Sequence, residues 1–509
     1  MSDEKSIKQL VESRHPEYED NLAHWNFLEE TYEGGREWFV PNLFRFIKEG
    51  DKEYEERVKR AYRFNHTKQV VDQVDKYLFK MPVARKSEDA PDAIKDFWKN
   101  ATLSGLDADT FAKRISNQTS QYGRVYIVVD STAVAGSIVS IKDEKKANQK
   151  IYAYIVRPQD MLDMSYDDLG RLNWCLVREY ARDDSNPMDS SRAMVERFRL
   201  WTRKGWTLYQ TVMKRGKKTY IEVADDTHDL KVVPVIQADH VFSEEQYGSS
   251  GLIDDVAYLD RAVANYLSNL DAVIQDQTFS QLVMPAQGVL PGELGYDKLI
   301  DMSTKRVFLY NGEGGGTPSY IAPDPKQAQL ILTAISSIVK EIYHSVGLSG
   351  ERTQSNSGGN DSEASGVAKS YDFERVNSLL SAKAAALQLT EEKIASLVCL
   401  YAGKPAGETD KLLEYPKEFD VRSVYDEFEI AEQLMTLAAP DEVRREQMRS
   451  LIKKLFPAAP DAVVTLLEGS LKSWPPEILV DAGGLGAPKL PGTSSGNTSK
   501  PAKKLATKA

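Results

Sequence analysis

The chain has 509 residues, 41% of them hydrophobic and 28% charged, which excludes wholesale disorder; at roughly 100–200 residues per domain, it predicts about three structural units. Two cysteines, a charged N-terminus without an apolar core and no run of about 18 apolar residues argue against a disulfide framework, a signal peptide and a membrane span. The net charge of −11 argues against a protein that coats nucleic acid, so we expect a soluble intracellular protein.

The first half of the chain predicts helices followed by antiparallel strands. Residues 1–80 carry apolar residues at helical spacings, and Met81-Pro82 ends the pattern because proline lacks an N–H. Two short helices are expected at 91–101 and 107–121. β-branched and aromatic runs then predict six strands, at 124–129, 151–156, 173–180, 196–202, 206–212 and 218–223. An α+β unit over about 1–240 follows.

Two long helices come next. Residues 252–280 repeat apolar side chains every three or four positions, which predicts a helix roughly 40 Å long. A second such pattern covers 325–346. Between them we expect a small insert with strands at 282–286, 306–309 and 319–322. We expect these two long helices to form an elongated pair, a stalk, that carries the compact β insert at its end.

The last third contains a polar loop and more helices. Residues 347–366, GLSGERTQSNSGGNDSEASG, are too polar and glycine-rich for a regular element, and such loops are commonly functional or disordered. A third long helix is expected from about 363 to 401. Further predicted elements are a strand at 414–421 and helices at 423–438, 440–456 and 460–471.

Residues 484–509 form a separate basic tail. They contain five lysines and no acidic residue, so residues 1–483 carry −16 of the net charge. Their Gly, Pro, Ser, Thr and Lys content buries too little apolar surface to offset the entropy of ordering, and we expect disorder. The tail either solubilises the end of the chain or serves as a flexible arm that touches polyanions.

Motifs for catalysis, metals and cofactors are missing from the sequence. There is no phosphate-binding GxxxxGK[ST] loop and no GxGxxG after a predicted strand. The six histidines are scattered without metal-ligand spacing, and Cys399 lies in an apolar helical stretch that favours a buried, inert thiol. We therefore expect no catalytic residues, no metal and no cofactor.

The order of these elements resembles that of the portal proteins of tailed bacteriophages. The resemblance rests on the long helix, the strand-containing insert, the return helix, and the Gly/Ser-rich loop that runs into the helix opening EASGVAKSYDFERVN. The N-terminal segments HPEYEDNLAHWNFLEETYEGG and YRFNHTKQVVDQVDKYLFKMPV are also similar to those of such proteins. The resemblance covers about residues 1–440; each motif alone is weakly specific, but their order is strongly so.

The resemblance implies an α+β portal fold assembled as a ring. Its parts are expected to be a wing of helices and antiparallel sheet (1–250), stem helices (251–280 and 325–347), a β-containing clip (281–324), a tunnel loop (348–362), a long wing helix with a return strand (363–422), α-helical crown (423–483) and the disordered basic tail (484–509).

The resemblance also implies the function and the partners. Portal proteins form a dodecameric ring, the head-tail connector at one capsid vertex, through which double-stranded DNA is packaged and ejected. The implied partners are other copies of the chain, DNA, the terminase large subunit, a head-completion adaptor or tail protein, and the major capsid and scaffolding proteins, with no membrane. The implied location is the virion, with assembly in the host cytoplasm.

An acidic body suits a protein that lets DNA pass. Each phosphate that a Lys or Arg neutralises adds a salt-dependent term to affinity, so an acidic or neutral channel does not hold a moving duplex. In the first long helix, several aspartates lie off the apolar stripe, and we expect them to face a channel. These are Asp254, Asp255, Asp260, Asp271 and Asp276.

Three groups of residues are candidates for contacts. The candidates in the tunnel loop, for contact with DNA in the channel, are Arg352, Ser349, Ser355, Asn356, Ser357 and Asn360. Those in the clip, for docking or for facing the lumen, are Lys298, Lys305 and Arg306. Those in the basic tail, for contact with DNA, are Lys500, Lys503, Lys504 and Lys508.

Several alternatives remain open at this point. Arg352 either contacts phosphates or pairs with Asp361 or Glu363, and the clip cations are either a docking surface or ordinary solvated surface. The chain as a whole is either a portal, another virion structural protein such as an adaptor or scaffold, or an enzyme whose site has no motif.

Overall fold

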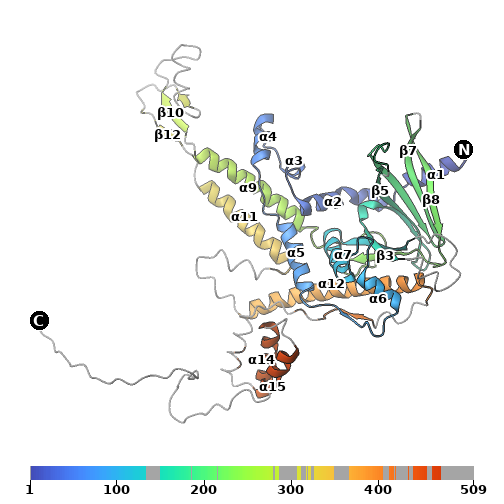
Figure 1. Ribbon diagram of the computed structural model, residues 1–509. Helices are drawn as coiled ribbons and strands as arrows, with labels where there is room; N and C mark the ends of the chain where they lie inside the picture. Colours follow the sequence, from blue (N-terminus) through green and yellow to red (C-terminus); the bar gives the residue numbers. More distant parts are fainter. Residues whose placement is uncertain are drawn as a thin grey trace, which may run out of the picture. The chain divides into compact units, whose positions relative to one another are not determined.

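The computed structural model describes two compact units, residues 1–421 and 422–509, each considered by itself below (Figure 1). The residues whose structure is described are 2–132, 150–184, 186–214, 216–278, 281–285, 307–310, 317, 319–321, 326–348, 366–404, 412–417, 419, 431, 434, 440–455 and 461–471.

The N-terminal helices begin and end where local signals place them. Asp107 caps one of them by accepting a hydrogen bond of 2.7 Å from the backbone N–H of Thr110, and Pro16 opens another, since proline suits the first turn. The expected helices around 91–101 and 107–121 are confirmed. The set is α1 (Ser2–Glu12), α2 (Pro16–Glu33), α3 (Phe39–Asn42), α4 (Asp51–Arg60), α5 (His66–Leu78), α6 (Asp92–Lys99) and α7 (Ala108–Tyr122).

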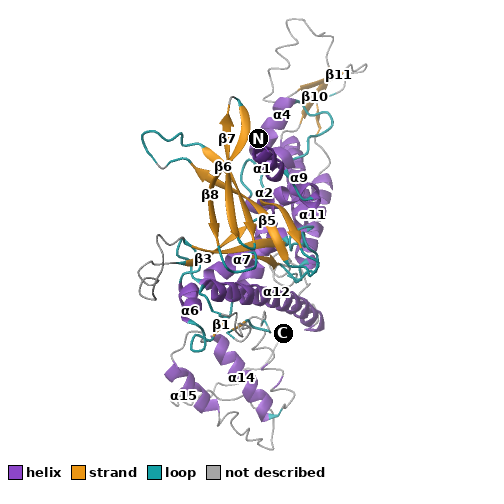
Figure 2. Cartoon of the chain, turned by 90° about the vertical axis from the view of Figure 1, so that its right-hand side faces the viewer, coloured by secondary structure: helices purple, strands orange, loops and turns teal. Residues whose placement is uncertain are grey.

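The antiparallel strands between α7 and α9 form two sheets, drawn in orange in Figure 2. The smaller has the order β3-β2-β9, from β2 (Arg124–Ser131), β3 (Ile151–Val156) and β9 (Val235–Asp239). The larger is a meander of β4 (Met161–Tyr166), β5 (Leu172–Arg182), β6 (Met194–Thr202), β7 (Gly205–Lys214) and β8 (Lys217–Thr227). All six expected strands are confirmed, whereas β4 and β9 were not predicted because both are short and mix apolar residues with Asp, Ser and Gln.

The three long helices are present. They are α9 (Val256–Thr278), α11 (Lys326–Ser345) and α12 (Gly366–Tyr401). Between α9 and α11 lie β10 (Gln281–Pro285), β11 (Val307–Tyr310) and β12 (Ser319–Ile321), in the order β11-β10-β12 with β10 and β11 parallel. Among the residues that the structure describes, no helix is long and apolar enough to cross a bilayer.

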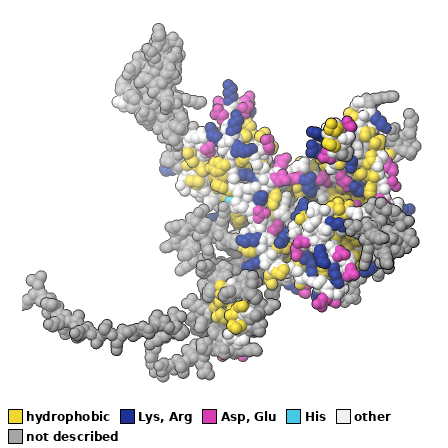
Figure 3. Space-filling view, in the orientation of Figure 1, with side chains coloured by type: hydrophobic (Ala, Val, Ile, Leu, Met, Phe, Trp, Pro, Cys, Tyr) yellow, Lys and Arg dark blue, Asp and Glu magenta, His cyan; other side chains and the backbone are white. Residues whose placement is uncertain are grey.

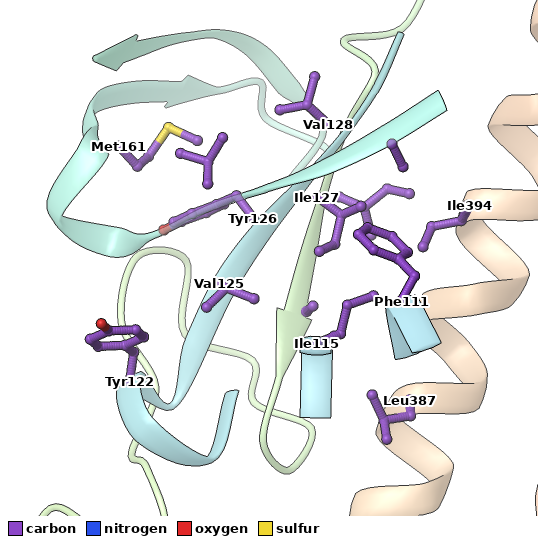
Figure 4. Close-up of a cluster of buried hydrophobic side chains, with 14 of the residues drawn as sticks. Phe111, Ile115, Tyr122, Val125, Tyr126, Ile127, Val128, Met161, Leu387 and Ile394 are labelled. Carbon is purple, nitrogen blue, oxygen red and sulfur yellow. The ribbon is translucent and has the colours of Figure 1, made fainter. Parts of the chain in front are cut away.

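The main hydrophobic core lies where α7, α12 and the smaller sheet meet (Figure 4). Phe111 and Ile115 of α7 point toward Ile127 of β2, and Leu387 and Ile394 of α12 close the other side. These side chains are at most 3% exposed, so α12 is an integral part of this core rather than an appendage. Cys175 and Cys399 are both buried and form no disulfide, and burial was expected for Cys399.

The strand expected at 414–421 is wrong. Among the described residues of this segment, 412–417 and 419, only Leu413 and Glu414 form a strand, β13, which pairs with β1 (Ala84–Arg85). After it the chain turns inward, because the Tyr415 hydroxyl donates to Glu391 on α12, and Pro416 has no N–H for a ladder.

In the second unit, the structure has α14 (Asp441–Leu455) and α15 (Asp461–Leu471), which confirms the last two expected helices. The helix expected at 423–438 falls outside the described residues, except that Ala431 and Leu434 are helical.

Candidate functional site

The contact residues selected from the sequence all fall outside the described part of the chain. They are Ser349, Arg352, Ser355, Asn356, Ser357 and Asn360 of the loop, Lys298, Lys305 and Arg306 of the insert, and Lys500, Lys503, Lys504 and Lys508 of the tail. The described elements that lead into these segments are above all the antiparallel helices α9 and α11.

The pair α9 and α11 is held together by the apolar stripes that the sequence shows. Val263 and Leu267 of α9 are buried, and Ile335, Ile338 and Val339 of α11 pack partly buried against the same core. The two helices lie alongside each other and both reach α5 at their base. The pair is thus anchored at one end and carries the three-stranded insert at the other (Figure 1).

The lower end of α11 is fixed just before residues 349–365. Gly347 has φ +76, and its N–H donates to the His344 carbonyl, while the N–H of Leu348 donates to the Tyr343 carbonyl at 2.7 Å. Leu348 is only 4% exposed. Arg375 of α12 reaches back to His344, with Nη1 and Nε2 3.2 Å apart. The chain therefore leaves α11 next to the first described side chains of α12.

A hydroxyl group ties this end of α11 to α5. Tyr343 donates to Gln69 Oε1 at 2.8 Å and lies 3.2 Å from His66 Nδ1. Replacing Tyr343 with phenylalanine should lower the free energy of unfolding by about 1–2 kcal/mol, because buried polar partners lose a hydrogen bond. Guanidinium unfolding of the two proteins measures this. The exposed Tyr62→Phe variant is the control, and an equal loss in both variants would contradict the assignment.

The aspartates that were expected to face a channel lie in different surroundings. Asp260 is fully buried and accepts hydrogen bonds from the N–H and hydroxyl of Thr67, at 3.1 and 2.9 Å. Asp254 accepts from the Gly251 N–H, and Asp271 accepts from Gln275. Asp254 and Asp255 precede α9, and Asp276 has no described side chain. The burial of Asp260 contradicts the expectation for that residue, because α5 packs against α9 there. For the exposed Asp255 and the partly exposed Asp254 and Asp271, a position facing the channel stays a prediction.

The outer face of α11 is almost free of charge. Between Lys326 and Lys340 the helix has no ionisable residue, and its exposed side chains there are Gln327, Gln329, Leu330, Leu332, Thr333, Ser336 and Ser337. Hydrophobic side chains gather over the helix pair on the face shown in Figure 3. Such a surface supplies few cations to a polyanion and is suited to packing or to passive contact.

The segment from α3 to α4, residues 39–60, is a structural feature that the sequence did not separate from its neighbours; we name it the arm. It packs on α9 through a small cluster of Trp38, Phe39, Leu43, Ala61 and Ala264. Asn265 of α9 donates to the Asn42 carbonyl at 2.9 Å and accepts from the Phe44 N–H at 2.8 Å. The local sequence around Asn42 and Phe44 cannot predict their contact with Asn265, because the segments are more than 200 residues apart.

A buried ion pair fixes the arm internally. Arg57 donates to both carboxylate oxygens of Glu49 at 2.7 Å, and its side chain is 5% exposed and that of Glu49 6%. It also donates to Ser268 of α9 at 3.0 Å, and its guanidinium lies 4.1 Å from the Phe46 ring centre. These hydrogen bonds to Arg57 hold the pKa of Glu49 below its usual value.

A second missed feature is a lysine sealed inside the main core. Lys383 of α12 is fully buried, and its Nζ lies 2.8 Å from the Ser116 carbonyl, 2.6 Å from the Ser120 hydroxyl and 2.9 Å from His240 Nδ1. Burial lowers the pKa of Lys383 to about 7, although the charge of Asp75 opposes this. Burial, together with Lys383, also lowers the pKa of His240. The signal was present in the sequence as one lysine within the apolar run SLLSAKAAALQL.

In the part of the chain that the structure describes, no three His, Cys, Asp or Glu side chains converge to hold a metal ion. The described residues around α9 instead form a pair of long helices fixed at their base, an outer face of α11 with no charged side chain between Lys326 and Lys340, and an arm held by a buried ion pair.

One family of known proteins matches most of the chain. The family described as "Phage portal protein, SPP1 Gp6-like" matches residues 15–437. No curated protein matches the chain. Among solved structures, the neck of an empty GTA particle computed with C6 symmetry is similar at 14% identity, over 79% of this chain and 89% of that chain, with a TM-score of 0.36. The virion of a native gene transfer agent particle gives 13% identity, 75% and 89% coverage and a TM-score of 0.37.

Proposed function

This chain belongs to the SPP1 Gp6-like phage portal proteins, a family of structural proteins, and on that premise we propose that it forms the ring at one capsid vertex through which double-stranded DNA is packaged and ejected. The observation that carries the proposal is the family match over residues 15–437. The proposed ring is a dodecamer located in the virion and assembled in the host cytoplasm. Its proposed partners are the terminase large subunit during packaging, an adaptor or tail protein afterwards, and the capsid and scaffolding proteins.

The proposed parts map onto described elements. The wing comprises α1–α7 with both antiparallel sheets, together with α12, and α9 with α11 forms the stem. The sheet β11-β10-β12 belongs to the clip, and α14 with α15 belongs to the crown. Residues 348–362 are proposed as the tunnel loop, which would begin at the anchored Leu348.

Charge supports passage rather than retention of DNA. Residues 1–483 carry −16 of the net charge. A channel lined by an acidic or neutral surface makes few phosphate contacts, so its affinity for a duplex is low and depends little on salt.

Deleting residues 350–362 tests the tunnel-loop assignment. We expect rings to assemble normally, because Leu348 and the helices on both sides retain their packing, while DNA packaging or retention fails. Electron microscopy of the purified variant and a nuclease-protection assay of packaged DNA measure the two outcomes. If the deletion prevents assembly, residues 350–362 are part of the subunit contact and the loop assignment is wrong.

Deleting residues 484–509 tests whether the basic tail contacts DNA through Lys500, Lys503, Lys504 and Lys508. Removing these cations should weaken the binding of rings to DNA and reduce its dependence on salt concentration. The full-length chain with these four lysines changed to glutamine is the matched control for length. Unchanged packaging and unchanged salt dependence would leave the tail as a solubilising end.

A further inference from the structure

The tip of the arm exposes large apolar side chains to solvent. Phe44 is 58% exposed, Phe46 40%, Val40 56% and Ile47 103%. They lie within eight residues of one another in sequence, on a segment with its own small core. A cluster of apolar groups displayed in this way is typical of a protein interaction site rather than of ordinary surface.

The arm tip is held in place before any partner binds. Arg57 bonds both oxygens of Glu49 and also the Phe44 carbonyl at 2.8 Å, and Asn265 of α9 fixes the Phe44 N–H. The Tyr54 hydroxyl lies 3.0 Å from the carbonyl oxygens of both Val40 and Leu43 and donates its one hydrogen between them. A preorganised surface loses little conformational freedom on binding, which favours affinity.

The outer face of α11 has the matching character. Leu330 is 71% exposed, and Thr333 and Ser337 lie on the same side of the helix, three and seven positions further along. Both are small, so another backbone can approach closely, and the charges of the helix lie toward its ends. An apolar tip packed here would bury no unpaired charge.

The two surfaces lie on different sides of the same helix. The arm contacts α9 through Ala264, Asn265 and Ser268, while α11 packs alongside α9, which lies between α4 and α11 in Figure 1. Neither surface can therefore cover the other within one chain. A subunit that has one surface on each flank joins head to tail with its copies, and such contacts close into rings when the rotation allows.

We propose that the arm tip of one subunit packs on the outer face of α11 of the neighbouring copy of this chain. The proposal rests on the proposed ring function and names the contact that builds the ring. The charges agree with it: Asp51–Glu56 at the start of α4 contain four acidic residues and one lysine, whereas two of the three charged residues of α11 are lysines.

The first test is the variant Ile47→Asp, compared with Met188→Asp, a control residue that is 88% exposed on the β5–β6 connection. Ile47→Asp should raise the concentration needed for half-assembly by more than about tenfold, while Met188→Asp should assemble like the original chain. Light scattering over a dilution series measures this, and circular dichroism checks that the subunits are folded.

The second test does not depend on a disruptive variant. Chains with only Ile47→Cys are mixed with chains with only Leu330→Cys and treated with a short bismaleimide; both natural cysteines are buried. The proposal predicts a cross-linked dimer in the mixture and none with Met188→Cys in place of Ile47→Cys. If the original chain forms rings but Ile47→Asp also does and no cross-link appears, the contact is wrong and the arm serves another partner, such as an adaptor. If the original chain forms no rings, the proposed function itself fails.

Discussion

Replacing Arg57 with methionine is expected to release the arm from α9 and to lower its opening free energy by about 3–5 kcal/mol. The reason is that the substitution leaves the Glu49 carboxylate, whose side chain is 6% exposed, without its cationic partner. It also removes the hydrogen bonds to Ser268 and to the Phe44 carbonyl. Amide hydrogen exchange of peptides from residues 39–60 measures the effect, with a rate increase of at least about a hundredfold expected.

Two further variants separate the ion pair from general damage. Lys52→Met removes an exposed cation from the same helix and should leave exchange in the arm unchanged. Combining Arg57→Met with Glu49→Leu removes the stranded carboxylate and should recover a large part of the loss, because an apolar pair can replace a buried ion pair. A double variant that exchanges faster than Arg57→Met would contradict this account.

The same pair has a predictable dependence on pH. Because the pKa of Glu49 is lowered in the folded protein, its contribution is fully present above the pKa of the unfolded chain. It is lost as the pH falls through the lower, folded value. The arm should therefore open preferentially in acid, and in Glu49→Gln this acid sensitivity of residues 39–60 should disappear.

Lys383 is expected to make the stability of the folded chain rise with pH above neutrality. The unfolded lysine titrates near 10.5, whereas in the fold its pKa is lowered to about 7, first by burial. Between these values the unfolded state binds more protons, so the free energy of unfolding increases with pH by up to about 1.4 kcal/mol per pH unit. The cost of burying the amine is greatest below pH 7 and vanishes above about pH 10.5.

The groups around this amine leave Lys383 as the main cause of the trend. His240 stays neutral because its own pKa is lowered well below its ordinary value, and on α7 the neighbours are the Ser116 carbonyl and the hydroxyls of Thr119 and Ser120. Asp75 on α5 has a pKa raised by burial, which affects acid rather than alkaline stability.

The comparison of Lys383→Met with the original chain isolates the effect. Between pH 7 and 10 the original chain should gain stability relative to the variant, whichever of the two is more stable at neutral pH. Lys393→Met, which removes an exposed lysine from the same helix, should track the original chain at every pH. Denaturation midpoints at four pH values suffice, and parallel curves for all three proteins would show that Lys383 is charged in the fold.

The sequence predicted those parts of the fold that depend on a regular pattern. The stripes of α9 and α11 repeat over six turns or so, and the predicted ends fall within a few residues of Val256–Thr278 and Lys326–Ser345. The three strands between them were found for the same reason. The family was identified from the order of the elements, because no single motif is specific enough to do so.

What the sequence did not reveal depends on contacts between distant segments. Arg57 looks like any cation on a charged helix, and only its approach to Ser268 shows that it is buried. Asp260 has the spacing of a polar face yet is fully buried against Thr67. The strand at 414–421 was predicted from composition, but Tyr415 instead points into the core and donates its hydroxyl to Glu391 of α12. Tertiary packing decides whether such residues are buried and whether such segments form strands, and a local sequence pattern does not predict that packing.

Electron microscopy of the purified chain tests the central claim most directly. Hollow rings with a central channel, built from copies joined at the level of α9 and α11, are the predicted result. Compact monomers at all protein concentrations would contradict the proposal that this chain forms a portal ring for DNA.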